Sequence, residues 1–109
     1  MIAMFGSERK KREAWAENEV ALGVQLVQGR LSITNDELIE AVQHFRAALT
    51  VFTPSAYPEQ AARIQAGLDS VQETIARRER FLDEAAKRFG WSEEMKERAR
   101  RQGNSSSTD

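Results

Sequence analysis

Cysteine is absent from this 109-residue sequence, and proline occurs only twice. The missing cysteine excludes disulfides, thiolate nucleophiles and thiolate metal sites, and it is consistent with a reducing compartment. No apolar run approaches the roughly 20 residues that span a bilayer. The opening residues, Met1 to Phe5, are too few for a signal peptide and lack its charged lead. We therefore expect a protein that has no membrane span and is located in the cytoplasm.

Groups that carry enzymatic chemistry are also scarce. The single histidine, His44, lies one helical turn after Glu40, so the two side chains share a helix face and offer two metal ligands. One such pair is too few for a metal site or for general-base catalysis. The sequence contains neither a Gly-rich phosphate loop nor a serine in a nucleophile context. We predict that the protein is not an enzyme and uses no metal or cofactor.

Charged residues are abundant and unevenly distributed. Acids dominate the middle of the chain, whereas bases dominate residues 8–13 and 76–101. Spacings such as Arg80/Glu84 are typical of a solvated helix face. The basic C-terminal region also offers phosphate contacts, with Phe81 and Trp91 nearby for stacking, through Arg77, Arg78, Arg80, Arg88, Arg98, Arg100 and Arg101. Because acids are interspersed and no recognition motif is present, we disfavour nucleic acid as the partner.

Apolar residues recur at helical spacing through most of the chain, which predicts an all-α fold. Ser7 is a suitable N-cap for a first helix that runs to about Gln28. Thr34 or Asn35 can cap a second helix, which continues to about Phe52.

The third helix is expected to be the longest. Pro58 suits its first turn, and its apolar stripe continues to Phe89, which gives some thirty residues or roughly 46 Å. Its second half must then project beyond the other helices, bend near residues 76–78, or contact another chain. Gly90 is a natural C-cap for this helix.

The chain is therefore expected to form one helical domain with irregular ends. Three main helices and a short C-terminal one would pack as antiparallel hairpins. The predicted parts are a flexible N-terminus over residues 1–7, the helical domain over 8–89, a short helix over 91–102 and a disordered tail over 103–109.

Small and large residues in the first two helices form a pattern that resembles the tetratricopeptide repeat. The matching residues are Leu22-Gly23 on the first helix and Ala41, Phe45 and Ala48 on the second, followed by Pro54 and Pro58. In that signature, small residues let the helices approach and large ones fill the gaps between them. The longer loops here resemble the extended repeats of bacterial proteins. The likeness covers residues 14 to about 74, about one and a half repeats, and a simple helical bundle is the alternative.

The resemblance implies a non-enzymatic adaptor or assembly subunit that binds a protein or peptide on a concave surface. First helices of successive repeats line that surface, which in this chain corresponds to Glu17, Val20, Val24, Val27 and Gln28, and to Arg63, Ala66, Ser70, Glu73 and Thr74. Family members that clamp a C-terminal carboxylate carry lysine and asparagine where this chain has Val20 and Val24, so no such clamp is expected. The alternative is that these valines pack on the third helix.

A solenoid normally needs about three repeats, and this chain has half that number. Either the segment with Trp91, Met95 and Ala99 folds back as a cap, or a second copy of the chain covers the missing faces. The predicted self-association stripe on the third helix consists of Phe81, Leu82, Ala85 and Phe89. If the chain is a helical-bundle subunit instead, the same long helix would dock it into a larger complex.

Overall fold

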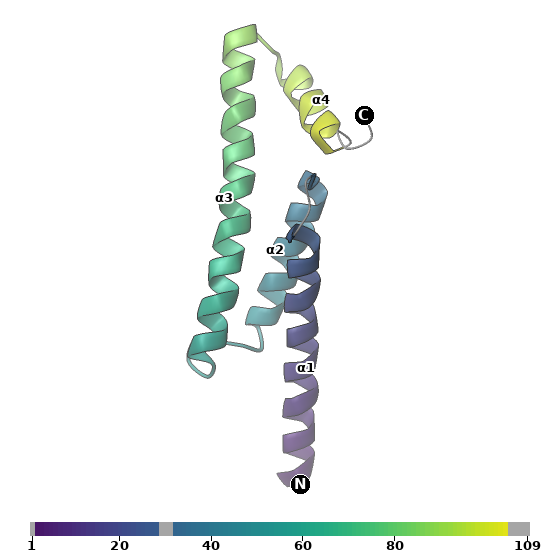
Figure 1. Ribbon diagram of the computed structural model, residues 1–109, viewed down its shortest axis with the longest axis vertical. Helices are drawn as coiled ribbons and strands as arrows, with labels where there is room; N and C mark the ends of the chain where they lie inside the picture. The colour runs from purple at the N-terminus through teal and green to yellow at the C-terminus, as the bar shows by residue number, and fades with distance from the viewer. Residues whose placement is uncertain (1, 29–31, 105–109) are drawn as a thin grey trace.

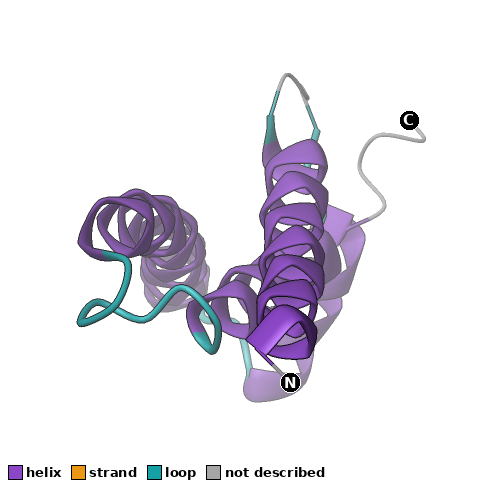
Figure 2. Ribbon diagram, turned by 90° about the horizontal axis from the view of Figure 1, so that it is seen from below, coloured by secondary structure: helices purple, strands orange, loops and turns teal. Residues whose placement is uncertain are grey.

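The computed structural model describes residues 2–28 and 32–104, which form four helices that run alternately up and down (Figure 1). They are α1 (Ile2–Val27), α2 (Asn35–Leu49), α3 (Pro58–Phe89) and α4 (Glu93–Asn104). α2 packs against both α1 and α3, and the end-on view of Figure 2 places α3 to one side of the α1–α2 pair. The described residues contain no strand, so the all-α prediction is confirmed.

The outer ends of the helical region differ from the prediction. α1 begins at Ile2, so Ser7 lies inside the helix and is not its N-cap. Glycine stands before Ser7 at position 6, but no proline does, and good helix formers follow, so the helix can extend through this point. At the other end α4 continues to Asn104, past its predicted end. The rest of the predicted tail, residues 105–109, lies outside the described residues.

α2 begins where predicted because Thr34 caps it. The Thr34 hydroxyl accepts a hydrogen bond from the backbone N–H of Glu37 at 3.1 Å. In return, the Glu37 carboxylate accepts one from the backbone N–H of Thr34 at 3.0 Å. This capping box satisfies two N–H groups that would otherwise lack a partner at the start of the helix.

Two aromatic residues hold the turn between α2 and α3. α2 ends at Leu49, before the predicted Phe52, which therefore lies in the turn. The buried Phe52 ring meets the Tyr57 ring edge-on, with centroids 5.1 Å apart. The Tyr57 hydroxyl donates a hydrogen bond to the Glu13 carboxylate on α1. The turn is thereby joined to the first helix.

Phe45 lies in the core between two glycines on different helices. Its ring is 3% exposed, comes from α2, and contacts Gly23 of α1 and Gly67 of α3. A Cβ atom added at Gly23 would lie 3.0 Å from the ring, and one added at Gly67 would lie 3.5 Å from it. Because neither residue has a side chain, both helices can approach the same ring.

The rest of the core surrounds this ring. Alanines that are 0% exposed supply further close contacts on α1 and α2, at Ala16, Ala41 and Ala48. Larger buried residues fill the remaining space, namely Leu38, Val42, Phe52, Ile64, Leu68 and Val71. Within residues 2–28 and 32–104, no helix is both long enough and apolar enough to cross a membrane.

α3 is one unbroken helix of 32 residues, whereas α2 has 15. Its second half therefore projects beyond α2, without a bend (Figure 1). The helix ends at the predicted Gly90, whose φ of 68° lies in the left-handed region that favours glycine. α4 then returns beside the projecting half and also contacts α2.

Ion pairs hold α4 against α3. Arg100 donates two hydrogen bonds to the Glu79 carboxylate, at 2.7 and 3.0 Å, and Lys96 Nζ lies 2.8 Å from the Asp83 carboxylate. The hydrogen bond from Arg100 lowers the pKa of Glu79, and the bond from Lys96 lowers the pKa of Asp83. The mixed charges expected on a solvated face thus partly join two helices, and the bidentate contact of Arg100 with Glu79 is stronger than a simple surface pair.

The two glycines that contact Phe45 are expected to respond differently to alanine. Gly67→Ala should stabilise the protein by about 0.5–1 kcal/mol, because alanine favours helix and its methyl group makes only ordinary contact at 3.5 Å. Gly23→Ala gains the same propensity but presses on the ring at 3.0 Å, so it should be less stable than Gly67→Ala by about 1–2 kcal/mol. Urea unfolding followed by circular dichroism measures both. In a Phe45→Leu background the difference in stability between the two alanine variants should become smaller. Equal stabilities of Gly23→Ala and Gly67→Ala in the native background would contradict tight packing at Gly23.

Docking of α4 is expected to weaken in acid. The pKa values of Glu79 and Asp83 are lowered in the folded state. The stability that these two carboxylates add to the folded protein is therefore complete above the ordinary carboxyl pKa values, near pH 4. It is lost as the pH falls through the lowered values. Trp91 fluorescence in a Trp15→Phe background should therefore change below about pH 4. Adding Lys96→Gln and Arg100→Gln should flatten that profile, and an unchanged profile would show that the ion pairs do not hold α4.

Candidate functional site

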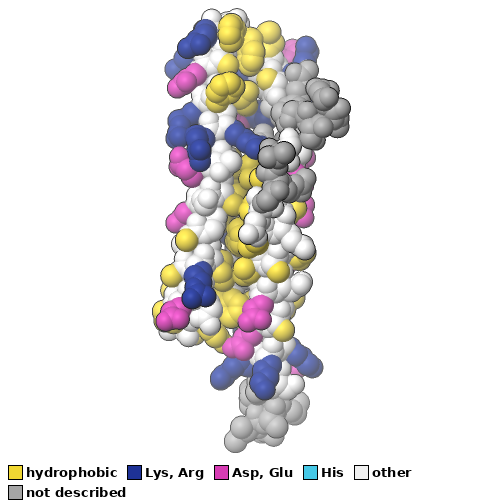
Figure 3. Space-filling model, viewed as in Figure 1, with side chains coloured by type: hydrophobic (Ala, Val, Ile, Leu, Met, Phe, Trp, Pro, Cys, Tyr) yellow, Lys and Arg dark blue, Asp and Glu magenta, His cyan; other side chains and the backbone are white. Residues whose placement is uncertain are grey.

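A hollow of about 180 Å³ lies between α1 and α3, beside the turn that precedes α3. It is lined by Glu17 and Val20 of α1, by Phe52 of the turn, and by Gln60, Arg63 and Ile64 of α3. Its walls are apolar, whereas the three polar side chains at its edge are exposed. Figure 3 shows hydrophobic side chains along the seam between α3 and the neighbouring helices, with charged groups on either side. This arrangement suits an apolar side chain of a partner.

The hollow brings together part of the predicted partner-binding set. Glu17, Val20 and Arg63 come from two helices and line the same space. Val24 and Val27 lie further along α1, where they are half-buried and pack against the core cluster. These two valines therefore contribute to the packing of the core.

Other predicted residues lie outside the hollow. Thr74 is half-buried, and its hydroxyl donates a hydrogen bond to the Ser70 carbonyl at 3.1 Å. Glu73 pairs with Arg80 at 3.3 Å on the exposed surface of α3. Ala66 and Gln28 are exposed, with Gln28 in the turn that follows α1. The hollow therefore involves a smaller set of residues than the concave surface predicted from the resemblance.

Three residues of the hollow were not assigned to any site from the sequence. Phe52 was placed at the end of the second helix, Ile64 is one of the apolar residues along the third helix, and Gln60 carried no signal. They meet because α2 ends early and the turn brings Phe52 towards the start of α3. The paired prolines at positions 54 and 58 were the available sign of that turn.

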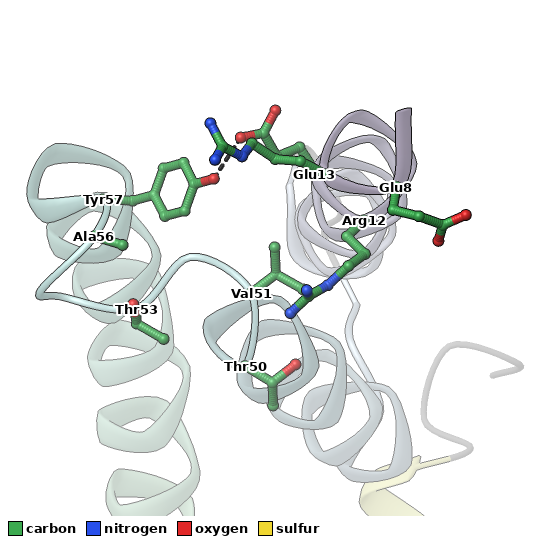
Figure 4. A pocket seen from close by; sticks show the side chains of 9 residues that line it. Glu8, Arg12, Glu13, Thr50, Val51, Thr53, Ala56 and Tyr57 are labelled. Carbon is green, nitrogen blue, oxygen red and sulfur yellow. Dashed lines mark hydrogen bonds between the residues drawn. The ribbon is translucent and has the colours of Figure 1, made fainter. Parts of the chain in front are cut away.

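A second hollow of about 400 Å³ lies between the first part of α1 and the α2–α3 turn (Figure 4). From one side Tyr57 points to Glu13, and its hydroxyl donates to that carboxylate. From the other side Arg12 extends towards Val51. The hydrogen bond to Glu13 raises the pKa of Tyr57, which makes its hydroxyl a weaker proton donor. The contact therefore fastens the turn to α1.

His44 joins two helices through its ring nitrogens. Nδ1 lies 3.0 Å from a carboxylate oxygen of Glu19 on α1, and Nε2 lies 3.5 Å from one of Glu40 on α2. The two carboxylates thus lie at opposite edges of the imidazole and do not surround a common centre. Across the described ranges, no group of three or more His, Cys, Asp or Glu side chains is placed to hold a metal ion.

The stripe predicted for self-association divides into exposed and half-buried parts. Phe81 is 71% exposed and Phe89 is 65% exposed, whereas Leu82 and Ala85 are half-buried. Phe89 also lies near Trp91, with ring centroids 6.0 Å apart. The exposed apolar surface of the projecting half of α3 therefore consists mainly of the two phenylalanines.

Comparisons of the chain with protein-family models, with curated proteins and with solved structures found no match.

Proposed function

We propose that the protein is a non-enzymatic adaptor or assembly subunit that binds a protein or peptide between α1 and α3, with a helical surface of the tetratricopeptide type. The main support for the proposal is the hollow beside the buried Phe52, which is lined by Glu17 and Val20 of α1 and by Arg63 of α3. The first and third helices are the pair that lines the binding surface in such repeats. An apolar side chain of the partner would enter the hollow, with its polar neighbours contacting Glu17 and Arg63.

The packing around Phe45 supports a repeat-type arrangement. Gly23 of α1 and Gly67 of α3 contact the same ring, so both helices approach α2 through a residue without a side chain. In a repeat array, the first helix of each unit packs on the second helix of its neighbour in the same manner. A helical bundle can also place small residues at close crossings, and the glycines at equivalent contacts on α1 and α3 are the feature that favours the repeat.

The arginines of the C-terminal region support a protein partner over nucleic acid. Most of them already contact an acid or an amide of the chain: Arg78 with Asn35, Arg80 with Glu73, Arg98 with Glu94, Arg100 with Glu79, and Arg101 with Glu97. The acids in these pairs lie beside the arginines and reduce the net positive potential that attracts phosphate. The described part of this region therefore presents mixed charges, which favours a protein partner over nucleic acid.

Site-specific photo-crosslinking in lysate of the native host tests the proposal. A benzoylphenylalanine placed at Gln60, on the edge of the hollow, is expected to capture a partner. The same group at the exposed Asp69, half a turn round the helix, should capture none. Glu17→Lys combined with Arg63→Glu should abolish capture at Gln60, because it reverses both exposed charges at the edge without altering the core.

Controls separate binding from folding. The double variant should keep the helicity and melting temperature of the native protein, since both side chains are exposed. Substitution of the valines is less informative because Val20, Val24 and Val27 pack against the core. Equal capture at Gln60 and Asp69, or full capture by the double variant, would rule out a partner in this hollow.

A further inference from the structure

The projecting half of α3 has an open face that no other helix covers. Phe81 is the most exposed large apolar side chain in the described residues, at 71%. α4 packs on the side of α3 that carries Glu79 and Asp83. Phe81 follows Glu79 by two positions, about 200° round the helix, so it points away from α4. Figure 3 shows hydrophobic side chains exposed on this half of the molecule.

Four charged residues accompany Phe81 along one face of α3, with spacings typical of a single helical stripe: Glu73, Arg77, Glu84 and Arg88. Within the described part of the chain, Arg77, Glu84 and Arg88 form no hydrogen bond or ion pair. Glu73 contacts Arg80 in an exposed pair, at 3.3 Å, which is a weak interaction in water. These charges are therefore available to a partner.

We propose that a second copy of the chain covers this face, with the two α3 helices antiparallel and a two-fold axis beside Phe81. Arg77 and Glu84 lie equally far from a point between residues 80 and 81, on opposite sides of it. The same is true of Glu73 and Arg88. The axis therefore places each residue of a pair opposite its counterpart in the partner, which gives four contacts between opposite charges.

The charge pattern also selects the direction of pairing. Two parallel α3 helices in register would place Arg77 next to Arg77 of the partner and Glu84 next to Glu84 of the partner, which is unfavourable. The antiparallel arrangement replaces both contacts with attractive ones. The overlap covers residues 72–89 of each α3, on the face turned away from α4. The α1–α2 pair lies beside the first part of α3 (Figure 1), so the two pairs would lie at opposite ends of the dimer. The hollow at Glu17 and Arg63 remains accessible, and the dimer does not rest on the proposed function.

The apolar and charged groups have different roles in this dimer. Burial of an aromatic ring removes about 150–250 Å² of surface from water, so the two Phe81 rings provide most of the affinity. Exposed ion pairs add little binding energy but determine orientation. A single pair of helices forms an interface at the small end of the range, so we expect a dissociation constant on the order of micromolar.

Charge reversal tests the arrangement by sedimentation equilibrium. Arg77→Glu places two glutamates opposite each other, and Glu84→Arg places two arginines opposite each other, so each variant alone should be monomeric. An equimolar mixture of the two should dimerise again, because every contact then joins opposite charges. The combined Arg77→Glu/Glu84→Arg chain should also dimerise, with a dissociation constant within about threefold of the native value.

Two further variants serve as controls for the dimer. Phe81→Ser should raise the dissociation constant by at least about tenfold with unchanged helicity, since its ring is exposed in the monomer. Asp69→Lys, a charge reversal on α3 outside the overlapping residues 72–89, should leave dimerisation intact. A monomeric native chain at several hundred micromolar would overturn the proposal, and so would a mixture of the two variants that stays monomeric. Photo-crosslinking from Gln60 in the Arg77→Glu variant measures partner binding at the hollow in a chain that does not dimerise, so the two proposals can fail independently.

Discussion

The contact of one phenylalanine ring with two glycines determines how the helices are placed. Phe45 of α2 lies between Gly23 of α1 and Gly67 of α3, so the two outer helices are positioned by the same side chain. Because both approach α2, they diverge on either side of it and leave a seam between them. That seam contains the hollow where Val20 and Arg63 meet. The candidate site is thus a consequence of how the core is packed.

The length of α3 imposes the second constraint. Its 32 residues exceed what α1 and α2 can cover, and the remaining half is supported by α4, mainly through ion pairs of Arg100 and Lys96. Such pairs orient a helix but bury little apolar surface. Phe81 and Phe89 therefore stay exposed, whereas most other large apolar side chains of the described residues are buried or half-buried. Two exposed aromatic rings on one helix end favour a surface that becomes covered in an assembly.

Local chemistry made several features predictable from the sequence. Thr34, Pro58 and Gly90 mark helix ends through their own hydrogen bonds or backbone preferences, and the structure confirms all three. The predicted start of α1 was wrong because Ser7, although suited to an N-cap, lies inside a helix that already begins at Ile2. The contact between Arg100 and Glu79 was missed because helical spacing rules describe neighbours three or four positions apart, not residues on different helices. The hollow forms because α2 ends at Leu49, so that Phe52 lies in the turn. The two prolines indicated a turn in this region but did not specify where α2 ends.

The two proposed surfaces lie at different ends of α3, and this separation has a functional consequence. Arg63 belongs to the first turns of the helix, whereas Phe81 lies in the projecting half, so self-association leaves the hollow open. A two-fold dimer would then present two hollows at opposite ends, which favours a partner with two recognition segments or two copies of a partner. Weak binding at a single small hollow would be compensated by the second attachment, because the linked site acts at a high effective concentration. A small helical chain would in this way bind more tightly than one hollow alone allows.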